Sequence, residues 1–167
     1  MVKDLVIRPA QPGDERDLFE LIRALAVYEK LEDRVTGSAA QLGEHLFGPR
    51  PACEALVAVD PSGRALGYAL FLGTYSTFLT CPGLYLEDLF VREEQRGQGI
   101  GSALLQAVAA RAVERGAARL EWAVLDWNTP AIGFYESLGA QRLDGWSTFR
   151  LTGAALERLA ASERGGQ

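Results

Sequence analysis

The sequence predicts an α/β protein of the α+β kind, with a single mixed, mostly antiparallel central sheet flanked by helices. Short apolar segments joined by a hairpin turn fill much of the first half, which favours antiparallel strands. In the second half a strand enters a glycine-rich turn that opens a helix, and another strand and helix follow, which favours a parallel pair. The 167 residues, 48% of them hydrophobic, predict one domain over 1–162 with a frayed tail over 163–167.

The first half of the chain is expected to alternate strands with helices. Asp14 should cap a helix whose apolar residues recur at three- and four-residue spacing, namely Leu18, Leu21, Ile22 and Leu25. A shorter helix is expected over 39–46. Strands are expected over 5–10, 55–59 and 65–75, the last two joined by the turn residues Asp60, Pro61, Ser62 and Gly63. Residues 77–83 should form a loop.

The second half is organised around residues 84–112. Eight mostly apolar and aromatic residues, 84–91, predict the central strand. The helix after the glycine turn is predicted by the spacing of Ile100, Leu104, Leu105, Val108 and Ala112. A helix over 130–138 should be capped by Thr129. The remaining expected elements are a fifth strand over 119–125, closing strands over 140–143 and 147–151, and a helix over 154–161.

Composition excludes several classes of protein. A net charge of −5 argues against nucleic-acid binding. Because no apolar run approaches the ~20 residues of a membrane span and the amino terminus enters a strand directly, we expect neither a membrane anchor nor a signal peptide, and therefore a cytoplasmic protein. The two cysteines, Cys53 and Cys81, lie far apart and His45 is the one histidine, so no metal site is expected.

The glycine-rich turn, Arg96-Gly97-Gln98-Gly99-Ile100-Gly101-Ser102, is suited to bind a diphosphate. Main-chain amides that open a helix have no internal partner and sit at its positive end. An ATP-type P-loop is rejected because no lysine follows Gly101, and a dinucleotide fingerprint is weak because Ser102 holds its third glycine position. The pattern formed by Arg96, Gly99 and Gly101 resembles the acyl-CoA cradle of GCN5-related N-acetyltransferases. A tight turn without a ligand is the alternative.

Asn128 and Tyr135 are a second pair of site candidates. They are seven residues apart, close to two helical turns, so they share a face at the start of the expected helix. Asn128 could hold an amide of an extended ligand, and Tyr135 could direct its phenol to the reactive end. Equally, Tyr135 could be a core aromatic and Asn128 a helix cap.

Several segments in order resemble the diamine (spermidine/spermine) N-acetyltransferase family, nearest its thialysine N-acetyltransferase branch. They are 28–29, 85–88, 96–102, 123–128, 134–135 and 138–141. The resemblance spans about Leu5 to Leu159. It implies the GCN5-related acetyltransferase fold, acetyl-CoA as cosubstrate without a metal, a small cationic amine as acceptor, and a homodimer. It also favours the functional roles of Asn128 and Tyr135.

The implied reaction is attack of a primary amine on the thioester of acetyl-CoA. An amine of pKa ~10.4 must first lose a proton, and a carboxylate can accept it directly or through water. Glu87 is our candidate base, and Asp88 is its rival. Because neighbouring residues of a regular strand face opposite sides, only one of the two should face the cleft unless a bulge intervenes. Tyr135 is the candidate acid for the leaving thiolate. By resemblance, coenzyme contacts fall on Arg96, Gly97, Gln98, Gly99, Ile100, Gly101 and Ser102, on main chain of Leu89, Phe90 and Val91, and on Asn128, Thr129, Pro130, Ala131 and Tyr135.

The resemblance also implies the acceptor site. Glu29 and Glu121 would supply negative charge for a second cationic group. The polyamine branch has Asp and Trp in the loop where this chain has Ser76, Thr77 and Phe78, so a lysine-like amine is favoured over a long polyamine. The alternatives are a protein or peptide N-acetyltransferase of the same fold and a non-catalytic acyl-CoA-binding module. The implied acceptor residues are Tyr28, Glu29, Glu87, Asp88, Glu121, Trp122, Ala123 and Asp144.

Overall fold

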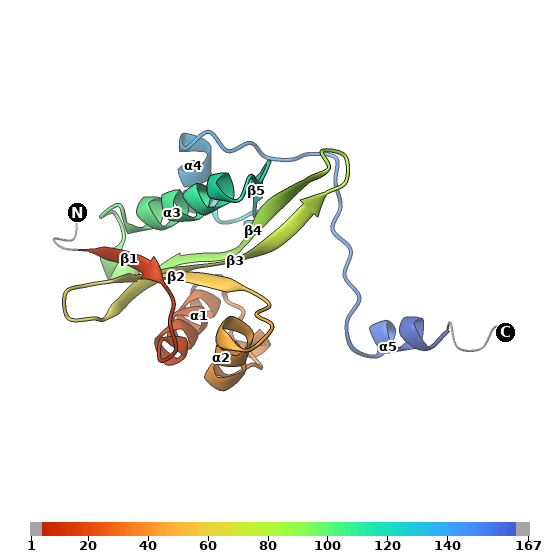
Figure 1. Ribbon diagram of the computed structural model, residues 1–167, viewed down its shortest axis with the longest axis horizontal. Helices are drawn as coiled ribbons and strands as arrows, with labels where there is room; N and C mark the ends of the chain where they lie inside the picture. The colour runs from red at the N-terminus through yellow and green to blue at the C-terminus, as the bar shows by residue number, and fades with distance from the viewer. Residues whose placement is uncertain (1–4, 163–167) are drawn as a thin grey trace. The chain divides into compact units, whose positions relative to one another are not determined.

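A computed structural model describes residues 5–162, which form two compact units divided in the sequence between Ala123 and Val124. Each unit is described by itself. The amino-terminal unit holds a five-stranded sheet in the order β1-β2-β3-β4-β5. Neighbouring strands are antiparallel except for β4 and β5, which are parallel. The expected mixed, mostly antiparallel sheet flanked by helices is therefore confirmed (Figure 1).

The elements of the amino-terminal unit follow the expected order. Among them, η1 and η2 are short 3-10 helices. The bounds are β1 (Val6–Pro9), α1 (Glu15–Glu29), η1 (Glu32–Arg34), α2 (Ala39–Phe47), β2 (Glu54–Val59), β3 (Ala65–Ser76), β4 (Cys81–Val91), η2 (Glu93–Gln95), α3 (Ile100–Glu114) and β5 (Leu120–Glu121). Part of the expected 77–83 loop is strand, because Cys81, Pro82 and Gly83 continue the ladder with β3.

Helices cover both faces of the sheet. In Figure 1, α1 and α2 lie on one face and α3 lies on the other. The first core joins α1 to β2, β3 and β4 through Leu18, Leu21, Val57, Tyr68, Leu70 and Phe90. Helix α3 is buried along the stripe that the sequence predicted, Ile100, Leu104, Leu105, Val108 and Ala112. Both helical layers thus fix β4 in the middle of the unit.

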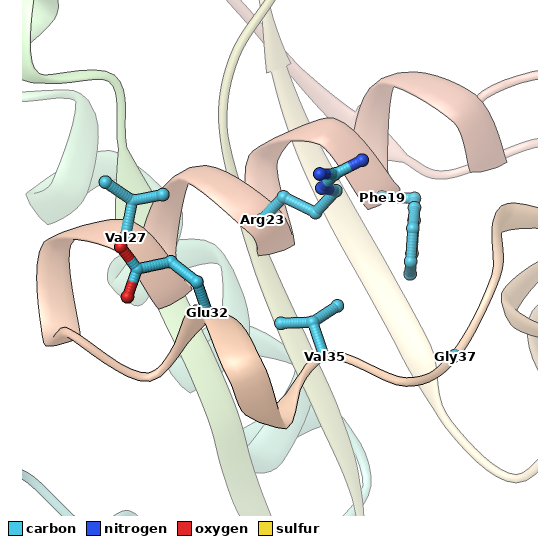
Figure 2. A pocket seen from close by; sticks show the side chains of 6 residues that line it. All are labelled: Phe19, Arg23, Val27, Glu32, Val35 and Gly37. Carbon is cyan, nitrogen blue, oxygen red and sulfur yellow. The ribbon is translucent and has the colours of Figure 1, made fainter.

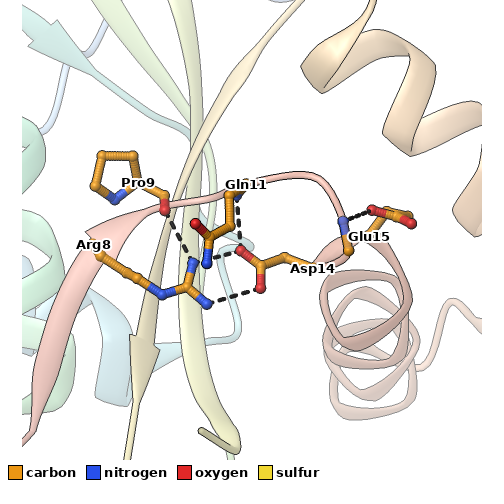
Figure 3. A network of polar contacts seen from close by, with 6 residues as sticks. Arg8, Pro9, Gln11, Asp14 and Glu15 are labelled. Carbon is orange, nitrogen blue, oxygen red and sulfur yellow. Dashed lines mark hydrogen bonds and ion pairs between the residues drawn. The ribbon is translucent and has the colours of Figure 1, made fainter.

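The start of α1 differs from expectation. Asp14 precedes the helix, but its carboxylate makes no capping bond to the helix amides. Instead it accepts two hydrogen bonds from the Arg8 guanidinium, one of them 2.8 Å from Nη2 to Oδ1, and a third from the Gln11 amide (Figure 3). The guanidinium is the main cause that lowers the pKa of Asp14. A paired carboxylate therefore ties β1 to the beginning of α1.

The second unit contains α4 (Thr129–Ser137) and α5 (Gly153–Ser162). The prediction of closing strands over 140–143 and 147–151 is wrong, since the described part of this unit has no strand. Their apolar side chains are exposed, Trp146 to 82% and Phe149 to 92%, and no ladder is available to hold extended backbone here. The expected fifth strand over 119–125 is also too long, because β5 pairs with β4 only at Leu84 and Tyr85.

Within residues 5–162, none of the helices is both long and apolar enough to cross a bilayer. The expected tail over 163–167 lies outside the described residues.

Candidate active site

A β-bulge in β4 determines how the two candidate carboxylates, Glu87 and Asp88, are oriented. Leu70 pairs with Asp88, whereas the next residue of β3, Phe71, pairs with Leu86, so Glu87 is the extra residue on β4. Without the bulge, Asp88 would share a face with Leu86. With it, Asp88 turns to the α1 face, and Glu87 is exposed beside it. The bulge that would change the faces of these neighbouring strand residues is therefore present, at Glu87.

Asp88 is half-buried and bonded to a residue that the sequence did not single out. The hydroxyl of Tyr68 donates to Oδ2 of Asp88 at 3.0 Å. Burial raises the pKa of Asp88 above its usual value, the charge of Glu87 raises it further, and the bond from Tyr68 opposes both. Tyr68 resembled a core residue because it sits in an apolar run. The available signal for a role near Asp88 was the hydroxyl of Tyr68, which lies two residues from Leu70, the strand partner of Asp88.

Glu29 supplies a third carboxylate from the end of α1. The helix stops there because Lys30 adopts a left-handed conformation, with φ of 61°. Burial raises the pKa of Glu29, and the negative charge of Asp88 raises it further, so the two groups interact. Among the predicted acceptor residues, the structure therefore groups Glu29, Glu87 and Asp88. Such a group favours a cation over an anion.

Arg96 connects this acidic group to the glycine turn. Its guanidinium carbon lies 4.4 Å from the centroid of the Tyr28 ring and 5.6 Å from that of Phe90. Its Nε donates to the Val91 carbonyl at 3.2 Å. The aromatic faces and this bond hold the guanidinium between the end of α1 and the end of β4, and its remaining N–H groups are donors suited to phosphate.

The turn itself fits a diphosphate. Gly97 and Gly99 have φ of 73° and 83°, and a Cβ on either would meet no heavy atom within 4 Å. The space in front of the turn at these two glycines is therefore open. The first main-chain hydrogen bond of α3 runs from the Ala103 amide to the Gly99 carbonyl, so the preceding amides lie at the positive end of the helix. The side chain of Ile100 is buried. The side-chain amide of Gln98 donates a hydrogen bond to Oε1 of Gln95 at 3.1 Å.

Beyond Tyr85, one main-chain edge of β4 has no strand partner among the described strands. On its β3 side the ladder continues through Leu89, Phe90 and Val91. On its other side β5 pairs at Leu84 and Tyr85 alone, and no other described strand adjoins that edge. Backbone groups at an unpaired strand edge can bind an extended amide-containing ligand. This is the property that the expected contact with the pantetheine arm requires.

The other predicted acceptor residues are placed less favourably. Glu121 forms an ion pair with Arg119, 2.7 Å from Oε2 to Nε, which offsets its negative charge. Trp122 and Ala123 follow β5 in irregular chain. Among the described residues, no group of three or more His, Cys, Asp or Glu side chains is placed to hold a metal ion.

In the second unit, α4 carries the remaining candidates. Asn128, rather than Thr129, precedes the helix as its cap, and its side-chain oxygen accepts from the Ala131 amide at 3.3 Å. Asn128 is buried, and Tyr135 is half-buried two turns further on. Asp144 lies on exposed chain, paired with Arg142 at 3.6 Å. Capping of the Ala131 amide therefore accounts for one role of Asn128.

A separate pocket lies on the outer side of α1. Figure 2 shows its lining, which comes from one stripe of α1 and the chain that follows, namely Phe19, Arg23, Val27, Glu32, Val35 and Gly37. Glu29 lies on a different side of the helix, since its position follows Leu18, Ile22 and Leu25 by helical spacing. None of the predicted site residues lines this pocket, and it adds nothing to the chemistry above.

Comparison with known proteins identifies the family and the fold. Residues 20–140 match the Acetyltransferase (GNAT) family. The chain is 43% identical over 166 residues to a thialysine N-epsilon-acetyltransferase of Bos taurus, covering 93% of this chain and 97% of that protein. It is 42% identical to the Sus scrofa protein of the same description, with the same coverage. An integron cassette protein from the mobile metagenome of V. cholerae has a similar structure, with a TM-score of 0.79 and 27% identity over 96% of this chain and 99% of that one.

Proposed function

Since the chain belongs to the acetyltransferase (GNAT) family, whose members use acetyl-CoA, we propose that it acetylates the primary amine of a small cationic substrate. A lysine-like amine such as thialysine is the favoured acceptor, and a diamine is the next. The single observation that carries the proposal is the β4 bulge at Glu87, which turns Asp88 to the α1 face, where its charge interacts with that of Glu29. The names of the relatives support the lysine-like class.

Acetyl-CoA supplies the acetyl group as an activated thioester. The residues proposed to hold its diphosphate are Arg96 and the main chain from Gly97 to Ser102. The open edge of β4 at Leu89, Phe90 and Val91 would bind the amide-bearing arm and offer an N–H to the developing oxyanion. From α4, Asn128 with the first-turn residues Thr129, Pro130 and Ala131 would complete the coenzyme contacts. The open space in front of Gly97 and Gly99 supports this assignment.

Glu87 is the proposed base. It is exposed, so an ammonium group or a bridging water can reach its carboxylate, which takes a proton from the amine. Tyr135 is the proposed acid, holding on its hydroxyl the proton that the thiol leaving group needs. Asp88 stays the rival base, because burial has raised its pKa toward the range in which a carboxylate accepts a proton more readily.

The acceptor site is proposed to use charge. Glu29 and Asp88 would hold the second cationic group of a lysine-like amine while Glu87 meets the reacting one. Tyr28, fixed against Arg96, would form the wall next to the coenzyme. Trp122 and Ala123 would line the β5 side. Glu121 and Asp144 are assigned only supporting roles, since Arg119 and Arg142 pair with them.

The test is a steady-state screen that follows CoA release from acetyl-CoA with thialysine, lysine, ornithine, short diamines and spermidine, with the product identified by mass. We expect turnover of lysine-like amines and a large loss in Tyr135→Phe. Acetylated peptides without small-amine turnover would instead identify a peptide acetyltransferase. Coenzyme binding without any turnover would identify a binding module. The homodimer and the cytoplasmic location stay predictions, and light scattering on the purified protein tests the first.

A further inference from the structure

Tyr68 is the most buried polar side chain near the acidic group. It is 0% exposed, and it packs in the core that joins α1 to the sheet, among Leu18, Leu21 and Leu70. A hydroxyl in such surroundings carries a cost unless it is hydrogen-bonded. Phenylalanine would fill the same space without that cost. The hydroxyl of Tyr68 donates its hydrogen bond to one described partner, Oδ2 of Asp88.

The β4 bulge makes this bond geometrically possible. Because Glu87 is the extra residue, Asp88 pairs with Leu70 and Phe90 pairs with Tyr68. Asp88 and Tyr68 therefore share one face of the sheet as diagonal neighbours, a separation that a long aromatic side chain can bridge. In regular register the carboxylate would turn to the α3 face, out of reach of Tyr68. One distortion thus directs Asp88 to Tyr68, beside the exposed Glu87.

The charges around Asp88 are otherwise unfavourable to its ionised form. Glu87 of β4 and Glu29 of α1 are both acidic and both interact with groups of this cluster, and burial adds to their effect. Tyr68 of β3 acts in the opposite direction, since a donated hydrogen bond favours a carboxylate. The phenol has no basic role of its own, because burial raises the pKa of Tyr68 well above its ordinary value.

We propose that Tyr68 is a positioning residue for the acceptor amine: its hydroxyl holds the Asp88 carboxylate beside Glu29, where it binds the cationic group of the substrate. The proposal rests on the proposed function, because it assumes an amine acceptor at this site. Tyr68 touches neither substrate nor coenzyme. Its effect is confined to amine affinity and to the pH at which that affinity is lost.

Tyr68→Phe keeps the ring and removes the donor. We expect KM for the amine to rise about three- to tenfold, with KM for acetyl-CoA unchanged. As pH falls, protonation of Asp88 removes the charge that binds the amine. Without Tyr68 the pKa of Asp88 rises, so the acid limb of kcat/KM for the amine should move to higher pH. A merely structural role would change the melting temperature without moving that limb.

Two further variants keep the test sharp. In an Asp88→Asn background, Tyr68→Phe should leave the acid limb of kcat/KM where it is, because residue 88 no longer titrates. Incorporation of 3-fluorotyrosine at position 68 keeps the fold nearly unchanged and strengthens the donor, so the limb should move to lower pH. This variant decides the question if Tyr68→Phe fails to fold.

The outcomes separate the two proposals. If the wild-type protein acetylates amines but Tyr68→Phe and the fluorinated protein both keep its amine KM and its acid limb, the role of Tyr68 is overturned and the proposed function stands. If the wild-type protein turns over none of the amines, the proposed function fails and the role of Tyr68 fails with it.

Discussion

The guanidinium of Arg96 stacks on the ring of Tyr28, 4.4 Å from its centroid. This contact joins the glycine turn that is proposed to bind the diphosphate to the end of α1, where the acidic acceptor group begins. Arginine suits such a position because its planar cation can stack on a ring while its rigid fork of N–H groups donates hydrogen bonds, whereas the compact ammonium of lysine has neither the flat face nor the fork.

Arg96→Lys should therefore weaken coenzyme binding more than a loss of charge explains. We expect KM for acetyl-CoA to rise about tenfold, since the fork of donors and the stacking on Tyr28 are lost while the charge stays. The control is Arg64→Lys, at an exposed pair with Glu94 close to the same turn. Steady-state kinetics with varied acetyl-CoA compare the two. Equal KM values in both variants would contradict a specific role for Arg96.

Gly99→Ala tests whether the turn is a cradle. Alanine at φ of 83° carries a backbone strain of about 1–2 kcal/mol. Gly63→Ala is a matched control, since Gly63 has φ of 86°, an equally open surrounding, and a place in the β2–β3 hairpin away from the turn. We expect similar losses in the free energy of unfolding, measured with urea. Only Gly99→Ala should also raise the dissociation constant for CoA in calorimetry, because its methyl group enters the binding space.

The division of labour between the two adjacent carboxylates can be measured. Glu87→Gln should lower kcat about a hundredfold with KM for the amine little changed, as expected for loss of a base. Asp88→Asn should mainly raise KM for the amine. Pre-steady-state kinetics separate the two effects. If kcat falls in Asp88→Asn and not in Glu87→Gln, Asp88 is the base.

The ion pair between Arg8 and Asp14 should contribute to stability in a pH-dependent way. The pKa of Asp14 is lowered in the folded state. The contribution of the pair is therefore fully present above the pKa of an unfolded aspartate, ~3.9, and is lost as pH falls through the pKa of Asp14 in the folded protein. Asp14→Asn should cost about 1 kcal/mol at pH near 7 and nothing in strong acid. Urea unfolding at both conditions checks this. Asp126→Asn, at an exposed pair with Arg142, is the control that should change nothing.

Much of the central element could be predicted from the sequence, which also allowed for a bulge in the strand but could not fix its position. The apolar run of 84–91 and the stripe from Ile100 to Ala112 mark β4 and α3 because periodicity follows burial. The bulge at Glu87 depends on how β3 and β4 pair, which is a property of two strands together. The same holds for β5, whose length is set by the two positions at which β4 accepts it.

Residues whose partners are distant in sequence were the hardest to assign. Asp14 reads as a helix cap from local sequence, but Arg8 holds its carboxylate. Tyr68 reads as core, and its hydroxyl matters only because the bulge brings Asp88 into reach. Residues 140–151 alternate enough to suggest strands, but strand conformation requires a neighbour that the described part of their unit does not supply.

The most direct measurement of the central claim is CoA release from acetyl-CoA by the purified wild-type protein with thialysine as acceptor, followed by mass identification of the product. The account predicts saturable turnover and a product carrying one acetyl group on the side-chain amine, with a large loss of turnover in Tyr135→Phe. Absence of amine-dependent CoA release across thialysine, lysine, ornithine and the diamines, in a preparation that binds the coenzyme, would contradict it.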